Sequence, residues 1–208
     1  MKLLRKWRVE FLVAGRNEEA LLEALDDPRY RRSDGMAVRI INALGRFGDC
    51  GAVGPILSVL REGRRATVRS TAAIALGRIG GPKAVLALRE LLDDEDRPTK
   101  MWAMRSVGQL RDRESVGRLI KALAGDDGGI RQYAAKALGE IGDQAATPAL
   151  IRALSDHKPS VRELAARSLA ELGDSRALEP VRRAHSEARG FTRRRIGRAL
   201  GELETRFG

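Results

Sequence analysis

The chain has 208 residues, of which 43% are hydrophobic and only 4% aromatic, so its core must be built mainly from Ala, Leu, Val and Ile. Such small aliphatic side chains favour helices packed on helices over a sheet core. Lys and Arg number 39 against 28 Asp and Glu, a net charge of +11 that suits nucleic acid, an acidic protein or an anionic membrane surface. The single cysteine, Cys50, excludes a disulfide within the chain, and two distant histidines give no metal-ligand spacing, so we expect no metal and no cofactor.

The first 35 residues are interpreted as an irregular opening repeat. Their basic start is not followed by a sustained apolar run before charge returns at Arg16, which indicates neither a signal peptide nor a membrane span. We therefore expect a cytoplasmic protein. Leu22 and Leu25 have the spacing of an apolar helical stripe, which fits the second helix of this opening repeat.

One motif recurs from residue 36 onward. Residues 134–143 read AAKALGEIGD, and related versions lie at 41–49, 72–81, 104–112, 166–174 and 197–204. We call the position of its first glycine the glycine slot; it holds Gly45, Gly77, Gly108, Gly139, Ala170 and Gly201. Successive slots are 32, 31, 31, 31 and 31 residues apart. This period predicts stacked repeats over 36–189 and a capping helix over 190–208.

Each repeat contains two helical patterns joined by a tight turn. Small or apolar residues one, two, four and five places before the slot predict a first helix, helix A, with a wide packing face. A second apolar stripe, for example Val53, Ile56 and Leu60, predicts a second helix, helix B. Glycine is expected at the C-cap of helix A, and we interpret the many glycines as helix ends.

An aspartate follows the slot by four places in most repeats. A carboxylate there can accept hydrogen bonds from the free N–H groups that begin helix B. The alternative is a row of catalytic carboxylates, which is disfavoured because no His, Ser or metal ligand accompanies them. The residues are Asp49, Asp112, Asp143 and Asp174.

The pattern VR-x-x-AA-x-ALG-x-IGD, followed by an apolar helix that carries Pro148 or Pro180, resembles the short HEAT-like repeat of the phycobilin-lyase type. The resemblance covers about residues 36–205, and weakly the first 27. It implies an all-α, right-handed α-α superhelix of about six helical hairpins plus a terminal helix, forming a single domain over 1–208. It also implies that the B helices line the concave side. Similar repeats occur in bilin lyase subunits, in DNA glycosylases for alkylated purines and in scaffolds without chemistry.

The position thirteen places after the slot predicts a binding face. It points away from the core stripe of helix B and is basic in three successive repeats, at Lys121, Arg152 and Arg183, with Arg89 and Arg182 one place earlier in their repeats. Neighbouring rungs would lie about 10 Å apart and could follow an acidic helix or a phosphate backbone. The alternative is a solvated face, because Glu90, Asp93 and Glu179 lie nearby in sequence.

For three further sets of basic residues, a structural role competes with a role in binding. A cation eight places before the slot (Arg69, Lys100, Arg131, Arg162, Arg193) is expected to pair with acidic or carbonyl groups of the preceding loop. A row three places before the slot (Arg105, Lys136, Arg167, Arg198) is expected to face solvent. The last helix carries a cluster that could be either a polar cap or an anion site: Arg193, Arg194, Arg195 and Arg198.

No arrangement of residues indicates catalysis. Nucleophilic catalysis requires a nucleophile beside an oriented base, and neither His157 nor His185 has such a neighbour in sequence. Glycine-rich phosphate loops and zinc-binding H-E-x-x-H motifs are also missing from the sequence. We therefore predict a non-enzymatic scaffold that binds an acidic or extended protein segment along the B helices. The alternatives are nucleic-acid binding and, from the resemblance alone, a lyase-like or glycosylase-like subunit.

Overall fold

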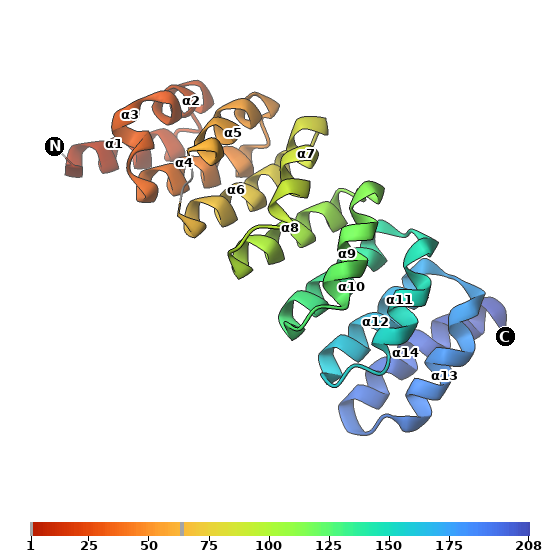
Figure 1. Cartoon of the computed structure of the whole chain (residues 1–208). Coiled ribbons are helices and arrows are strands. Elements are labelled where there is room, and N and C mark those ends of the chain that lie inside the picture. Colours follow the sequence, from red (N-terminus) through yellow and green to blue (C-terminus); the bar gives the residue numbers. More distant parts are fainter. Residues whose placement is uncertain (1, 63–64) are drawn as a thin grey trace. The chain divides into compact units, whose positions relative to one another are not determined.

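The computed structural model describes residues 2–62 and 65–208, with the side chains of 2–5 and 31 excluded (Figure 1). Every regular element in these residues is helical, which confirms the all-α prediction. The α-helices are α1 (Lys2–Ala14), α2 (Glu18–Asp26), α3 (Pro28–Arg31), α4 (Asp34–Phe47), α5 (Val53–Arg61), α6 (Ala66–Ile79), α7 (Pro82–Leu91), α8 (Arg97–Gln109), α9 (Val116–Leu123), α10 (Gly128–Ile141), α11 (Thr147–Ala153), α12 (Pro159–Leu172), α13 (Leu178–Glu187) and α14 (Gly190–Phe207).

The chain divides into two compact units, Met1–Ser106 and Val107–Gly208. In the first unit α4 packs between α2 and α6, and α5 and α7 lie against α6. Its core is aliphatic, as the composition predicts, and Ile40 and Leu44 are fully buried. Leu25 of the opening repeat is also fully buried, whereas Leu22 is half-buried. The assignment of the whole chain to a single domain stays a prediction.

The second unit has two layers of helices (Figure 1). The A helices α10, α12 and α14 pack against one another in that order, and the B helices α9, α11 and α13 each pack against an A helix. Short 3₁₀ turns lead into the B helices, for example Gln144–Ala146 before α11. The predicted alternation of A and B helices is therefore present in the described residues.

The turns after α4, α10 and α12 have the predicted glycine and aspartate, whereas α6 is followed by glycines without an aspartate and α8 by Arg111 and Asp112 without a glycine. Gly142 caps α10 in the left-handed conformation with φ 76°, and Gly48 and Gly173 cap α4 and α12 in the same way. The backbone N–H of Ala145 donates to Asp143 Oδ1 at 2.9 Å, and equivalent bonds reach Asp49 and Asp174. At Asp112 the carboxylate accepts a hydrogen bond from the Ser115 hydroxyl at 2.5 Å. The capping interpretation is confirmed for Asp49, Asp143 and Asp174, whereas Asp112 makes no side-chain cap hydrogen bond and its carboxylate binds Ser115 instead.

The glycine slot is not at a helix end, which corrects our interpretation of the glycines. Gly77 and Gly139 lie inside α6 and α10, three residues before the cap, and both are buried. A Cβ on Gly139 would lie 2.5 Å from Ser168 Oγ of α12, and one on Gly77 would lie 2.2 Å from Ser106 Oγ of α8. The slot is small because the next A helix packs directly onto it.

Candidate functional site

Three cations form an unneutralised row on the B helices of the second unit. Lys121 on α9, Arg152 on α11 and Arg183 on α13 occupy the same position in successive repeats, and all three are exposed. Within residues 2–62 and 65–208, their side chains have no ion pair or hydrogen bond. We call these three residues the basic row.

Several other arginines of the second unit are neutralised by carboxylates of the chain. Arg131 of α10 donates from Nε to Asp156 Oδ2 at 2.6 Å and from Nη2 to Oδ1 at 3.1 Å, and both side chains are less than one-tenth exposed. The hydrogen bonds that Arg131 donates to this carboxylate raise the pKa of Arg131. Burial alone would raise the pKa of Asp156, but hydrogen bonds from Arg131 and from the Lys158 N–H outweigh it, so that pKa is lowered.

The Arg131 pair has a counterpart in the first unit, where Arg69 Nε donates to Asp94 Oδ2 at 2.7 Å. In both cases the carboxylate follows the arginine by 25 residues, in the loop after helix B. The preceding loop supplies carbonyl groups instead, as when Arg162 donates to Asp156 O at 2.8 Å. The expected pairing with carbonyl groups of the preceding loop is present for Arg131 and Arg162. The carboxylates that bind Arg69 and Arg131 come from the following loop, which was not predicted.

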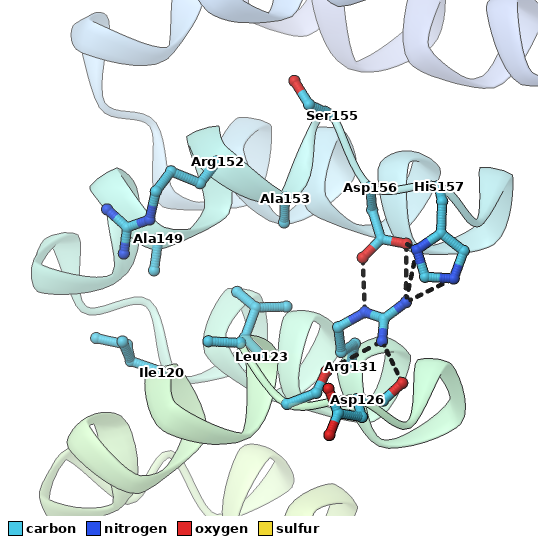
Figure 2. Close-up of a pocket in the computed structure, with 12 residues that line it drawn as sticks. Ile120, Leu123, Asp126, Arg131, Ala149, Arg152, Ala153, Ser155, Asp156 and His157 are labelled. Carbon is cyan, nitrogen blue, oxygen red and sulfur yellow. Dashed lines mark hydrogen bonds and ion pairs between the residues drawn. The ribbon is translucent and has the colours of Figure 1, made fainter.

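A groove of about 380 Å³ lies between α9 and α11 beside the middle cation of the row (Figure 2). Its lining is mixed: Ile120, Leu123, Ala149 and Ala153 form an apolar patch among polar and charged residues. Figure 2 shows the Arg152 guanidinium at one end and the Arg131–Asp156 pair with His157 at the other. The groove therefore places a free cation next to a surface that accepts apolar groups.

Two other residues predicted for this site have different environments. Arg182 on α13 donates hydrogen bonds to Glu179 and to Glu204, and Arg182 Nη2 lies 3.0 Å from Glu204 Oε1. The hydrogen bond to Glu204 raises the pKa of Arg182. Arg182 is thus already neutralised. Arg89 is half-buried on α7 and belongs to the first unit. Neither forms part of the unneutralised row.

The basic cluster of α14 is only partly available for an anion. Arg195 lies 3.6 Å from Glu163 Oε2 and stacks over Phe191, with 4.5 Å from its guanidinium carbon to the ring centre. Arg193, Arg194 and Arg198 are exposed, and the structure gives their side chains no partner among the described residues. One of the four arginines therefore helps to dock α14, and three remain free.

In the row three places before the slot, Arg198 is exposed as expected, whereas Lys136 and Arg167 form ion pairs. Lys136 lies 3.6 Å from Glu140 and Arg167 lies 3.2 Å from Glu171, each one helical turn along. Glu140 and Glu171 each lie one place after the glycine slot, but their ion pairs were not predicted from the sequence. Arg105 instead lies over the Trp102 ring at 5.4 Å.

The groove was not predicted from the sequence either. Its apolar patch combines core-stripe positions with alanines, and only the packing of α9 against α11 places them together. His157, interpreted as a solvated loop residue, is largely exposed and lies at the groove end. Across the described part of the chain, no group of three or more His, Cys, Asp or Glu could hold a metal ion.

Comparison with protein families settles the nature of the repeat. A model of HEAT repeats matches residues 18–108, 53–130 and 116–201. The chain belongs to the HEAT-repeat family. No curated protein matches this HEAT-repeat protein. In the part of the chain that the structure describes, none of the helices is both long and apolar enough to cross a membrane.

Several solved structures share the fold of this HEAT-repeat protein. A designed armadillo repeat protein in complex with the peptide (KR)4 is 17% identical, with a TM-score of 0.65, over 88% of this chain and 98% of that chain. The complex of CpcE and CpcF of phycocyanin lyase from Nostoc sp. PCC7120 is 22% identical, with a TM-score of 0.58, over 73% and 99%. Human deoxyhypusine hydroxylase in complex with glycerol is 20% identical, with a TM-score of 0.51, over 95% and 99%. These likenesses concern the fold alone, because one fold hosts unrelated functions.

Proposed function

We propose that this HEAT-repeat protein is a scaffold whose basic row, Lys121, Arg152 and Arg183, binds an extended acidic segment of a partner protein. The observation that carries the proposal is the lack of acidic partners for these three cations within the described residues. Arg131 and Arg167 of the same unit are neutralised by carboxylates of the chain itself. A row of like charges repels itself, and an acidic ligand relieves that repulsion.

The period of the repeat favours an extended ligand. Helices of neighbouring repeats pack about 8–10 Å apart. An extended peptide in the polyproline II conformation advances about 3.1 Å per residue with about three residues per turn, so every third side chain faces the same side and would meet the next cation. The proposed ligand thus carries Asp or Glu at every third position. The designed armadillo protein that holds the peptide (KR)4 supports the use of this fold for charged peptides, although the ligand charge proposed here is the opposite.

The groove beside Arg152 adds a subsite for an apolar side chain. Ile120, Leu123 and Ala149 belong to its apolar patch next to the guanidinium. An apolar ligand group seated there would exclude water from the neighbouring ion pair and strengthen it. We therefore expect Arg152 to contribute more to binding than Lys121, which does not line the groove.

Nucleic acid is the second candidate because the net charge is +11. Proteins that bind single strands usually stack bases on exposed aromatic side chains. The large exposed aromatic residues in the described parts of the chain are Trp7, Phe11, Phe191 and Phe207, on α1 and α14. None of these aromatic residues lies on the B helices that carry the basic row, which favours the acidic peptide.

The test compares two labelled peptides of equal composition by fluorescence anisotropy. One carries Glu at every third position with Leu and Ser between, and the other has the same residues with the Glu clustered. The regular peptide should bind more tightly, and replacing Lys121, Arg152 and Arg183 by Glu should abolish the difference. Equal binding of both peptides by the unaltered protein would contradict the proposal.

The matched control reverses three other exposed cations of the same unit, Arg193, Arg194 and Arg198. This variant has the same net charge as the first but keeps the basic row, so it should retain preference for the regular peptide. Labelled single-stranded and duplex DNA and RNA are measured alongside at low and physiological salt. Tight binding with a steep salt dependence, lost only when the basic row is reversed, would establish the nucleic-acid alternative.

A further inference from the structure

Helix α1 has apolar side chains on two opposite faces. One face is part of the core of the first unit: Val9 is 1% exposed and Leu12 is 9% exposed, and α1 packs against α2 and α4. On the other face Trp7 and Phe11 are 72% and 77% exposed. These two residues are one helical turn apart and therefore form a continuous aromatic ridge.

The charges beside this aromatic ridge are positive. Lys6 and Arg8 adjoin Trp7 in sequence, so on a helix they flank it on either side, and both are exposed. Among the described residues neither side chain has an acidic partner. The acidic residue of α1, Glu10, forms an ion pair with Arg39 of α4, so it does not neutralise the flanking cations.

The shape of the ridge favours a soft surface over a folded partner. The hollow next to α1 is lined by Val9, Val13 and Arg39, on the packed side of the helix. Trp7 and Phe11 project from the other side as a convex feature, and a protein partner would need a matching pocket to bury them. A lipid interface adapts to projecting groups, and helices that lie in it combine Trp or Phe with flanking Lys and Arg.

From this arrangement we infer that α1 docks the chain on an anionic lipid surface. Trp7 and Phe11 insert among the headgroups, and Lys6 and Arg8 contact the lipid phosphates. The helix lies along the surface while Val9 and Leu12 keep it attached to the fold. This inference is independent of the basic row, because it concerns other residues in the other compact unit.

The test uses the fluorescence of Trp7 in the full chain. The chain has two tryptophans, so Trp102→Phe leaves Trp7 as the sole indole. Vesicles of phosphatidylcholine alone are compared with an equimolar mixture of phosphatidylcholine and phosphatidylserine. We expect a blue shift of Trp7 emission and co-sedimentation with the anionic vesicles, both weakened by added salt.

Two variants of the full chain separate the contributions of the ridge. Replacing Trp7 and Phe11 together by Ser should lower partitioning into anionic vesicles at least about tenfold, because both inserted rings are lost. The matched control replaces Phe191 and Phe207, the exposed aromatic pair of α14, and should leave partitioning unchanged. Replacing Lys6 and Arg8 by Glu should remove the preference for anionic lipid. Circular dichroism confirms that each variant keeps its helices.

Three results would overturn the inference. The first is an unshifted Trp7 emission in the presence of anionic vesicles. The second is equal loss of partitioning in the α1 and α14 variants. The third is a Trp7 emission shift that depends on protein concentration without vesicles, which would assign the ridge to contact between two copies of the chain.

Discussion

Gly139 of α10 provides the space that the side chain of Ser168 in α12 occupies. The serine hydroxyl is fully buried there and donates to the Ala135 carbonyl oxygen at 2.8 Å. The same arrangement recurs in the first unit, where Ser106 donates to Ala73 O at 3.0 Å beside Gly77. The missing Cβ of the glycine thus leaves room for a buried serine hydroxyl between two A helices, and the hydroxyl is hydrogen-bonded as a buried polar group must be.

Substitution of the slot glycine is the first prediction. Gly139→Ala should destabilise the protein by roughly 1–3 kcal/mol, because the added methyl group would overlap Ser168 and force the helices apart. Urea unfolding followed by circular dichroism measures the change in the free energy of unfolding.

Gly201 is the matched control, because it occupies the same slot in the last helix. No atom lies within 4 Å of a Cβ built on it, outside its own helix backbone and chain neighbours. Gly201→Ala should therefore stabilise the protein by about 0.5–1 kcal/mol through higher helix propensity. Equal effects of the two substitutions would show that packing does not select the slot residue.

The buried pair between Arg131 and Asp156 gives the second prediction. Arg131→Ala leaves a carboxylate that is 9% exposed without its main partner, so it should cost about 3–5 kcal/mol. Arg167→Ala removes one member of an exposed pair and should change the free energy of unfolding by less than about 1 kcal/mol. Comparable losses in both variants would contradict a structural role specific to the buried pair.

Asp174 makes stability depend on acid pH. Hydrogen bonds from Arg176 and from the Thr147 hydroxyl lower its pKa from 3.8 to about 2. Because the pKa is lower in the folded state, the stabilisation is complete above about pH 4 and is lost as the pH falls toward 2. Asp174→Asn should destabilise the protein by roughly 1–3 kcal/mol at neutral pH and much less at pH 2. Urea unfolding at several pH values measures the difference, and a constant difference would exclude this carboxylate as its source.

Glu171 has the opposite dependence on pH. Burial raises its pKa above 4.5, with a further rise from Glu140 and Glu202, while Arg167 opposes the shift. The folded state therefore holds the proton more tightly, and stability falls as the pH rises from 4.5 through the raised pKa. Glu171→Gln should stabilise the protein by a few tenths of a kcal/mol at neutral pH, because solvent screens this partly exposed group. If Glu171→Gln instead lowers the melting temperature at neutral pH, the ion pair with Arg167 stabilises the protein by more than burial of the carboxylate destabilises it.

The candidate site was only partly predictable from the sequence. The position of the basic row followed from the repeat register, and its side chains are exposed. Arg182 was assigned to the same face, but it pairs with Glu204, which is 22 residues away on α14. The distinction between a free and a paired arginine depends on such distant contacts. Sequence spacing within one repeat does not contain them.

The sequence by itself determined the helices, their turns and the period of the array. Gly142 and Asp143, for example, act through backbone groups within four residues, so their roles can be read locally. Tertiary structure decided what each repeat position contacts in the next repeat. Gly139 meets a neighbouring helix whereas Gly201 meets none, and Arg131 is neutralised whereas Arg152 is free beside a groove. The physical reason is that packing and ion pairing join residues about one repeat apart, and their outcome depends on both partners.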